Sequence, residues 1–380
     1  EEVLINEDLN NFQNSSQIKV VGRISCLEKG FSNETNLILE IDSKNYFHLN
    51  FENEYFKQEN IFIFPNQILM LEGFLENNRK YLNVTEVHPY IWKNITFQEN
   101  QEQIFDNYRK IIISTGPFSP KSTFNFNAFD LLLKKAKEIK VSALILLGPF
   151  LDIENQVVKT SDLGADLSFE QLQNSLFERA ATSLGPNVQI IVIPSTKDVL
   201  SFENIPQQPL EIQISSNYQQ NIKSFSNPAY FEMDELSFYI GNSDIALNTY
   251  MGSFSKNKKN QNPIQQIPNV FESIFSQKNL YSMYPFLDQK DPKKITENIN
   301  LEKIGNFDVN FDVENEDFPK IVISPSNLPC FAQKINDTVV INPGYVIKQE
   351  TKGNFAVLTH FECNNNIRIS QKIKIDFYTL

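Results

Sequence analysis

The apolar pattern of this 380-residue chain changes near residue 100, and this change constrains the fold more than any other feature. Up to Val87, short segments of alternating apolar and polar residues are separated by polar turns, a pattern typical of strands. From Lys110 onward, apolar runs of strand length alternate with segments that have helical apolar spacing. The change predicts a multi-domain α+β chain with two domains, 1–100 and 101–380.

The first region is expected to form a small barrel. Gly22 and Gly73 fall inside two expected strands, where glycine commonly marks a bulge or a tight barrel bend. Five strands with the longer connection between the third and fourth are typical of an OB-fold β-barrel, and an SH3-like barrel is the alternative. The expected strands are Ile18–Glu28, Leu37–Asp42, Tyr46–Phe51, Ile68–Glu76 and Tyr81–Val87.

The second region predicts a two-sheet α/β sandwich. The segments Phe129–Ile139 and Phe169–Ala180 repeat apolar residues at the spacing of a helix face. Each lies between apolar runs that have the length of buried strands. The expected strands are 111–114, 143–147 and 188–193, followed by a second set at 230–240, 320–324, 338–341, 355–361 and 367–377.

Two stretches of the second region are expected to be mobile surface insertions. Ser253 to Gln266 is rich in Lys, Asn and Gln, and Asp288 to Asp317 is charged and weakly apolar. Neither buries enough apolar surface to offset the entropy lost on ordering.

The charge of the chain disfavours nucleic acid as a direct partner. The formal net charge is -12, and residues 1–100 carry 15 Asp and Glu against 8 Lys and Arg. An acidic surface repels the phosphate backbone, so we expect weak or no direct nucleic-acid binding and a protein partner instead.

The remaining composition predicts a soluble intracellular chain. No apolar run is long enough to cross a bilayer, so no membrane association is expected. Cys26, Cys330 and Cys363 lack metal-ligand spacing and are expected to be buried free thiols. Because the sequence begins with Glu rather than Met, we expect it to be a fragment of a longer protein.

The loops that follow the expected strands are the usual place for chemistry in an α/β fold. They read Ser114-Thr115-Gly116-Pro117, Gly148-Pro149-Phe150-Leu151-Asp152, Pro194-Ser195-Thr196-Lys197-Asp198 and Ser324-Pro325-Ser326-Asn327. Their order resembles that of the calcineurin-like metallophosphoesterases, whose loops carry DxH, GDxxD, GNH(D/E) and GHxH. Two metal ions there need carboxylate and imidazole donors.

The resemblance implies an inactivated phosphodiesterase-like domain. Pro149 stands where that family has a ligand aspartate, and Thr196 and Lys197 stand where it has Asn and His. A lysine ammonium at such a position repels a metal dication. We therefore expect no catalytic residue, no bound metal and no cofactor. The vestigial site loops contain Thr115, Gly116, Gly148, Pro149, Asp152, Thr196, Lys197, Asp198, Asn342 and Gly344.

A barrel followed by a degraded phosphoesterase resembles the B subunits of the replicative DNA polymerases. Several short sequence motifs resemble motifs of the B subunits of polymerase alpha, although Lys197 replaces the Arg of one of them. The B subunits of polymerases delta and epsilon are the alternative. The motifs are Phe64–Gly73, Ser114–Phe118, Gly148–Asp152, Pro194–Asp198 and Val340–Gly344.

This resemblance implies a nuclear, non-catalytic accessory subunit used in primer synthesis for DNA replication. Its implied partners are the C-terminal domain of the polymerase alpha catalytic subunit, the primase subunits, and telomere factors such as a single-strand-binding complex or telomerase, which act in telomere C-strand synthesis. The family's N-terminal helical domain and linker are absent from this sequence. An active metallophosphoesterase and a single-strand-binding OB protein are the alternatives from other classes.

Individual polar and aromatic residues favour structural roles. Asp152 and Asp198 are expected to cap helices or close Asx turns. The three histidines, His48, His88 and His360, lie outside the strand-end loops and are not expected to bind metal. If the barrel binds single strands by stacking, the candidate rings are Phe47, Phe51, Phe74 and Tyr81.

Overall fold

A computed structural model describes most of the chain, in two compact units. The first unit comprises Glu1–Lys93 and Ile245–Ile299, and the second comprises Asn94–Asp244 and Asn300–Leu380. The described residues are 17–28, 30–52, 54–76, 80–88, 107–160, 167–214, 217–256, 258, 262–287, 291, 294–300, 303, 319–348, 350–362 and 372–380.

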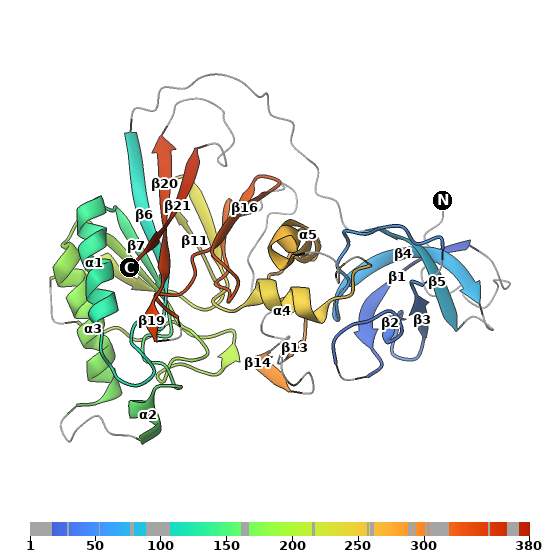
Figure 1. Ribbon diagram of the computed structural model, residues 1–380, viewed down its shortest axis with the longest axis horizontal. Coiled ribbons are helices and arrows are strands. Elements are labelled where there is room, and N and C mark those ends of the chain that lie inside the picture. Colours follow the sequence, from blue (N-terminus) through green and yellow to red (C-terminus); the bar gives the residue numbers. More distant parts are fainter. Residues whose placement is uncertain are drawn as a thin grey trace. The chain divides into compact units, whose positions relative to one another are not determined.

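The first unit contains a closed five-stranded barrel, coloured blue in Figure 1. Its strands follow one another around the barrel in the order β1-β2-β3-β5-β4. Along β4 and β5, buried apolar residues alternate with half-buried or exposed ones, because successive side chains point to opposite faces of a strand. The strands are β1 (Gln17–Cys26), β2 (Leu37–Glu40), β3 (Tyr46–Asn50), β4 (Ile68–Glu76) and β5 (Tyr81–His88). The five predicted strands are therefore confirmed.

The two barrel glycines occupy the positions that their sequence context predicted. The register between β4 and β5 shifts between Glu72 and Gly73, which is a β-bulge. A Cβ on Gly73 would collide with the Asn83 carbonyl, and a Cβ on Gly22 would lie 2.6 Å from the Glu40 carbonyl oxygen. Glycine is needed at both positions because the backbones approach so closely.

The first unit also contains a later part of the chain, with α4 (Ile245–Gly252), α5 (Pro263–Phe275), β13 (Phe286–Leu287) and β14 (Ile295–Ile299). Phe254 belongs to the apolar core of the barrel, where its ring centroid lies 4.9 Å from that of Phe51. Phe254 and Ile63 also exchange backbone hydrogen bonds of 2.7 and 2.9 Å.

The expectation that Ser253 to Gln266 is a mobile insertion is therefore wrong for the described part of this stretch. Ser253, Phe254, Ser255 and Gln266 are buried, and Pro263 begins α5 with its N-terminus capped by the Asn262 side chain. The polar composition concealed one phenylalanine that completes a core.

The expectation for Asp288 to Asp317 needs a smaller correction. Ile295–Ile299 forms β14, which pairs antiparallel with β13, so this part is a strand. The long stretch 304–317 lies outside the described residues.

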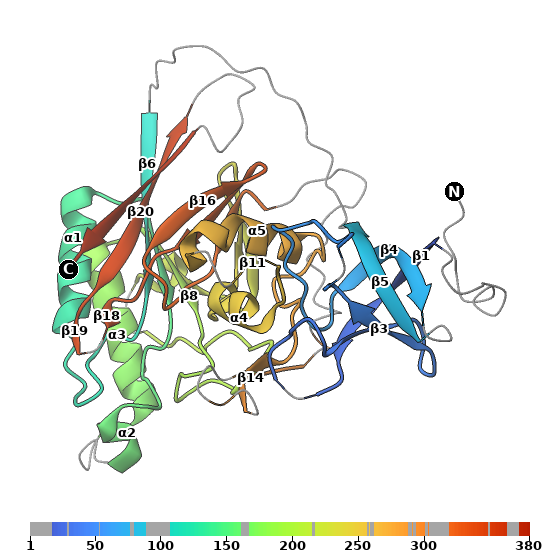
Figure 2. The same cartoon turned by 45° about the vertical axis from the view of Figure 1, so that its right-hand side comes forward.

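The second unit is built on a six-stranded sheet of order β10-β8-β7-β6-β20-β21. Strands β10, β8, β7 and β6 are parallel, whereas β20 and β21 are antiparallel to their neighbours. Two helices, α1 (Asn127–Ile139) and α3 (Phe169–Leu184), cover one face (Figure 2). The strands are β6 (Asn107–Thr115), β7 (Ala143–Leu147), β8 (Gln189–Ile193), β10 (Ile222–Ser224), β20 (Asn354–Glu362) and β21 (Ile373–Thr379).

A second, five-stranded sheet of order β11-β12-β15-β17-β16 packs on the opposite face. Ile111, Ile113 and Ile145 of the first sheet share a core with Phe238 and Ile341 of the second, while Ile112 and Leu144 face the helices. The predicted two-sheet α/β sandwich is therefore present. Its strands are β11 (Ala229–Met233), β12 (Leu236–Ile240), β15 (Ile321–Ile323), β16 (Phe331–Ile335) and β17 (Thr338–Asn342).

The remaining elements are short. In the second unit they are α2 (Gln156–Thr160), β9 (Asn204–Ile205), the 3-10 helix η2 (Gln219–Asn221), β18 (Ile347–Lys348) and β19 (Thr351–Lys352). Among the described residues, no helix is both long and apolar enough to cross a membrane. Cys26 and Cys330 are half-buried free thiols, and Cys363 lies outside the described residues.

The division of the chain differs from the expected domains 1–100 and 101–380. Residues 245–299 cluster with the barrel and not with the α/β unit. Besides Phe254, the Gln277 side chain bonds to the backbone of Ile68, with its Oε1 accepting from the amide at 2.8 Å and its Nε2 donating to the carbonyl at 3.0 Å. These contacts join residues that are distant in sequence, so a local change of composition could not reveal them.

Candidate functional site at the strand ends

The second unit brings the predicted site loops together at the carboxyl ends of its parallel strands. Thr115 ends β6, Gly148 follows β7, and the 194–198 loop follows β8. From the second sheet, β17 ends at Asn342, and the loop after it reaches the first sheet, where the Val346 amide donates to the Thr115 carbonyl at 2.8 Å. The site is therefore lined by loops of both sheets.

Two glycines allow these loops to approach one another closely. A Cβ on Gly116 would collide with the backbone of Pro149, and one on Gly148 would collide with the Asp198 carboxylate. The Gly148 amide also donates to the Ile193 carbonyl at 2.9 Å. Any larger residue at either position would force the loops apart.

The Asp198 side chain fastens the loop after β8 to the loop after β7. Its Oδ1 accepts from the amides of Phe150 at 2.5 Å and Leu151 at 3.3 Å, and its Oδ2 accepts from the Ser195 amide at 2.8 Å. Burial raises the pKa of this carboxyl to about 7, against the lowering effect of the three amides. These three contacts all serve the local backbone, as the predicted structural role requires.

The other predicted site residues lie in different surroundings, and the buried Thr115 has a hydroxyl with no hydrogen-bond partner among the described residues. Asp152 is buried, its Oδ1 accepts from the Glu154 amide at 2.8 Å, and its backbone forms a bridge with Asp198. Lys197 is exposed and Thr196 is half-buried. The Asx turn predicted for Asp152 is confirmed.

Asn242 has a role that the sequence analysis did not identify. It is buried after β12, and its Nδ2 donates to the carbonyls of Gly148 at 3.2 Å and Pro194 at 2.9 Å. Its own amide donates to Asn227 Oδ1 at 3.0 Å. The Asn242 side chain thereby ties both loops of the first sheet to the second sheet.

Asn342 plays the corresponding part within the second sheet. Its Oδ1 accepts from the amides of Ser326 at 2.9 Å and Gly344 at 3.0 Å. Its Nδ2 donates to the carbonyls of Leu328 at 3.1 Å and Pro329 at 3.2 Å. Gly344 has a φ of 73°, a left-handed conformation that favours glycine. All the hydrogen-bonding capacity of this amide is used internally.

Within the described residues, three side chains that could share a metal ion occur together at one place, and it is not at these loops. Glu72, Glu86 and His88 lie on the outer side of the barrel, with His88 Nε2 3.2 Å from Glu72 Oε2. The sequence analysis did not group them. Lys19 Nζ lies 3.4 Å from the same Glu72 oxygen, so a cation of the protein already balances this carboxylate.

The barrel rings divide into core and surface residues. Phe47 and Phe51 are buried, so two of the four predicted stacking candidates are wrong. They fall on the inward face of β3 and in the turn after it. Tyr81 is exposed, and its ring stacks on that of His48 with 4.8 Å between centroids. His48 is half-buried and lies between the buried Phe47 and Leu49 on β3, so its ring is on the outer face of the barrel.

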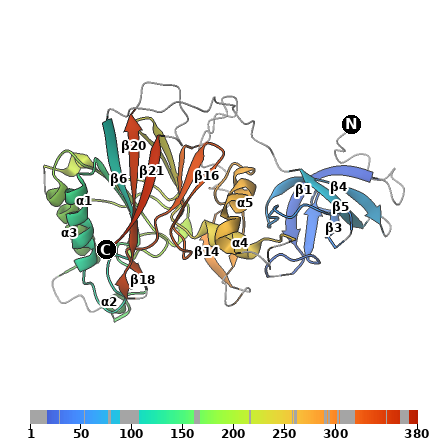
Figure 3. The same ribbon diagram turned by 45° about the horizontal axis from the view of Figure 1, so that its top comes forward.

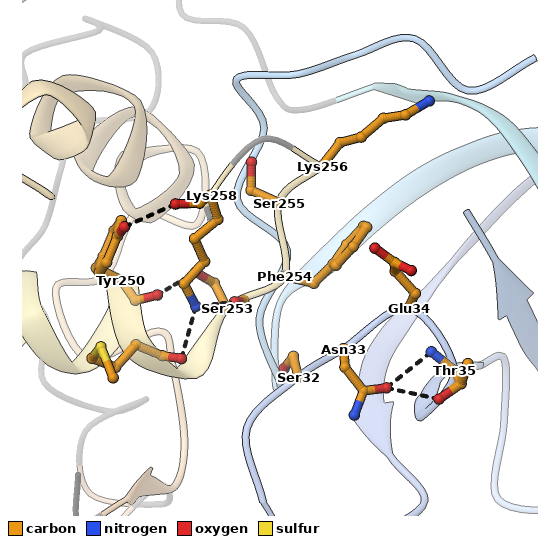
Figure 4. Close-up of a pocket in the computed structure, with 11 residues that line it drawn as sticks. Ser32, Asn33, Glu34, Thr35, Tyr250, Ser253, Phe254, Ser255, Lys256 and Lys258 are labelled. Carbon is orange, nitrogen blue, oxygen red and sulfur yellow. Dashed lines mark hydrogen bonds between the residues drawn. The ribbon is translucent and has the colours of Figure 1, made fainter. Parts of the chain in front are cut away.

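A cavity of about 510 Å³ in the first unit lies between the β1–β2 loop and the chain after α4 (Figure 4). Lys258 Nζ donates to the carbonyls of Met251 at 2.9 Å and Ser253 at 2.6 Å. Burial lowers the pKa of Lys258 to about 8. The lining residues are Ser32, Asn33, Glu34, Thr35, Tyr250, Met251, Ser253, Phe254, Ser255, Lys256 and Lys258. Only one of them is a carboxylate and none is His or Cys, so the cavity lacks a metal-ligand set.

The comparisons with known proteins agree on one family. The sequence profile of the B subunits of DNA polymerases alpha and epsilon matches residues 111–333. A Saccharomyces cerevisiae protein named as the B subunit of DNA polymerase alpha is 26% identical, over 91% of this chain and 54% of the relative. The Schizosaccharomyces pombe protein of the same name is 24% identical, over 78% of this chain and 51% of the relative. The chain spans about half the length of these curated relatives.

Similarity to solved structures is weaker. A structure titled as a novel archaeal phosphodiesterase has 12% sequence identity and covers 71% of this chain and 99% of its own, with a TM-score of 0.33. A TM-score of this size is too low to establish a shared fold.

Proposed function

Because the chain belongs to the family of B subunits of DNA polymerases alpha and epsilon, we propose that it is a non-catalytic accessory subunit of DNA polymerase alpha–primase. It docks on the C-terminal domain of the catalytic subunit and tethers it to primase. The observation that carries the proposal is the match to the family over residues 111–333, together with several relatives that are named as the B subunit of polymerase alpha.

The geometry of the strand-end loops supports a non-catalytic role. The buried polar side chains here form hydrogen bonds with backbone atoms of the loops themselves, as Asp198, Asn242 and Asn342 do. Two-metal phosphoesterases need carboxylates and imidazoles that converge on open coordination positions. The loops here act instead as a rigid framework for a binding surface.

We assign the two units to the folds that this role implies. The closed barrel of order β1-β2-β3-β5-β4 is an OB fold, and the two-sheet unit is a degenerate phosphodiesterase-like domain. The support for the first assignment is the strand order and the bulge at Gly73. The support for the second is the order of the loops along the chain.

The proposed setting is the nucleus, where the complex makes primers for replication. Telomere-maintenance factors are a further class of partner, in line with telomere C-strand synthesis. The net charge of -12 supports protein partners over direct contact with DNA.

Binding to isolated catalytic-subunit domains tests the accessory role. The full chain is titrated with the purified C-terminal domains of the polymerase alpha, delta and epsilon catalytic subunits, and affinities are measured by calorimetry. We expect the alpha domain to bind at least about a hundredfold more tightly than the other two, a difference of about 2.7 kcal/mol. Equal or tighter binding of the delta or epsilon domain would contradict the assignment.

Metal content and hydrolysis test the non-catalytic part separately. We expect elemental analysis to find no stoichiometric manganese, zinc or iron, and bis-p-nitrophenyl phosphate to stay intact when these metals are added. Hydrolysis by the chain that disappears in an Asp152→Asn variant would identify an active phosphoesterase and refute this part.

A further inference from the structure

Strand β21 forms one end of the six-stranded sheet of the second unit (Figure 3). It pairs antiparallel with β20 over seven residue pairs, from Ile373 opposite His360 to Thr379 opposite Asn354. Among the described residues, β21 has no other strand neighbour. One side of its backbone therefore offers the amide and carbonyl groups of an edge strand, which can pair with a further strand.

The side chains of β21 are unusually apolar for an edge. Phe377 is 38% exposed and Tyr378 is 44% exposed. Ile373 and Ile375 lie on the Phe377 face and pack only partly against the core between the sheets. Natural edge strands are usually protected from pairing by charges, prolines or bulges.

The charges of β21 are arranged symmetrically about one residue. Lys374 and Asp376 flank Ile375 and point to the same face, with Lys374 Nζ 2.9 Å from Asp376 Oδ2. An edge protected by charges of a single sign would repel a second copy of itself. Two opposite charges placed symmetrically about a centre do the reverse.

We propose that β21 pairs antiparallel with β21 of a second copy of this chain, with the two-fold axis at Ile375. In this register Lys374 lies opposite Asp376 of the second copy, and the same pair forms again across the axis. Ile373 lies opposite Phe377 of the second copy, so the apolar face is extended on both sides. Opposite charges and apolar side chains directly across an antiparallel pair each favour pairing.

Other self-pairing registers are less favourable. A two-fold axis at Asp376 places the two Asp376 carboxylates opposite each other, and an axis at Lys374 does the same to two ammonium groups. Like charges directly opposite destabilise a strand pair. A shift of one residue would place the apolar face of one copy against the polar face of the other. The register centred on Ile375 is the one in which charge and apolar pattern agree.

The choice of a second copy over an unrelated strand rests on this self-complementarity. The pairing is independent of the proposed accessory role, since it uses only the second unit's own edge. It would join two six-stranded sheets into one continuous sheet, and because the axis is perpendicular to the sheet, the helices of both copies stay on the same face.

Charge exchange in the full-length chain tests the pairing, with self-association measured by sedimentation equilibrium. We expect Asp376→Lys to weaken association at least about tenfold, because it replaces two attractive cross-strand pairs by two repulsive ones. The double variant Lys374→Asp with Asp376→Lys recreates both pairs and should restore association to within about threefold of the wild type. Lys135→Glu, at an exposed ion pair on α1, is the matched control and should leave association unchanged.

Site-directed crosslinking tests the register. Residues directly opposite in an antiparallel pair are about 4.5 to 5.5 Å apart at Cα, within the range of a disulfide. We expect Ile375→Cys to give a symmetric disulfide dimer on mild oxidation, identified by peptide mass spectrometry, whereas Phe377→Cys should not link to itself. A chain that stays monomeric at all concentrations, or a double variant that is no better than the single one, overturns the proposal. Efficient linkage of Phe377→Cys to itself would overturn the register and with it the charge argument.

Discussion

The strand-end loops of the second unit and the described part of the Ser253–Gln266 stretch of the first are both held in place, but by different kinds of contact. The loops are held by buried polar groups such as Asp198 and Asn242, whose partners are backbone atoms. The start of the other stretch is held by one apolar side chain, Phe254, which enters the barrel core. A polar stretch of sequence therefore predicts neither a reactive site nor a mobile segment unless the contacts of its side chains are known.

The largest effect on stability is expected at Gly148, where a substitution directly tests whether close packing holds the strand-end loops together. Gly148→Ala places a methyl group against the buried Asp198 carboxylate, so it should lower the free energy of unfolding by about 4 kcal/mol or more. Gly185→Ala is the control, because no atom lies within 4 Å of a Cβ there and only the cost of its backbone conformation (φ 76°, ψ -176°), roughly 1 to 3 kcal/mol, should appear. Urea unfolding followed by circular dichroism measures both. Equal losses would mean that the loops can part without cost.

Phe254→Ala tests the other side of the comparison. Removing a buried phenylalanine should cost about 3 kcal/mol, because a cavity remains beside Phe51. Phe202→Ala, at a ring that is 68% exposed, should change stability by less than about 0.5 kcal/mol. A Phe254 variant as stable as the Phe202 variant would mean that Phe254 does not stabilise the barrel core and that the stretch around it is a loosely packed insertion.

The pH dependence of stability tests whether the buried Asp198 carboxyl is protonated in the folded chain. Its pKa of about 7 in the folded chain lies above its ordinary value of 3.8, so its contribution is complete below pH 4 and is lost as pH rises through 7. The difference in unfolding free energy between wild type and Asp198→Asn should therefore shrink by roughly 2 kcal/mol between pH 5 and pH 8. Urea titrations at several pH values measure it. A difference that grows with pH would mean that the carboxylate is held ionised by its three amides.

The smallest effect is expected at Lys258. Its two hydrogen bonds to carbonyl groups are offset by the burial that lowers its pKa to about 8, so Lys258→Met should cost less than about 1 kcal/mol. Lys334→Met, at an exposed lysine, provides the reference for removing one surface charge. A loss at Lys258 as large as that at Phe254 would mean that polar contacts, rather than the phenylalanine, hold this stretch.

The local elements of both units could be predicted from the sequence, because strand and helix patterns depend on neighbouring residues. The alternation in β4 and β5 and the helical spacing of apolar residues in α1 and α3 are of this kind. The structural role of Asp152 was also predicted, since its bond partner, Glu154, is two residues away.

Features that depend on distant residues could not be predicted in the same way. Asn242 acts on Gly148 and Pro194, which are separated from it by 94 and 48 positions. Nothing near Asn242 in the sequence distinguishes it from an asparagine in an ordinary turn. The assignment of 245–299 to the barrel unit was missed for the same reason, because the contacts of this segment are with barrel residues that lie far earlier in the sequence.

The discontinuous first unit has a consequence for synthesis on the ribosome. The Phe62 amide donates to the Ser273 hydroxyl, a partner 211 residues later, so the barrel side of this contact emerges long before the other. At a translation rate of roughly 5 to 20 residues per second, the segment that contains Ser273 is synthesised about 10 to 40 s after Phe62. During this interval Phe51 and Ile63 lack the cover that Phe254 provides. The early barrel is therefore the stage at which a chaperone that binds exposed apolar surface would have most to protect.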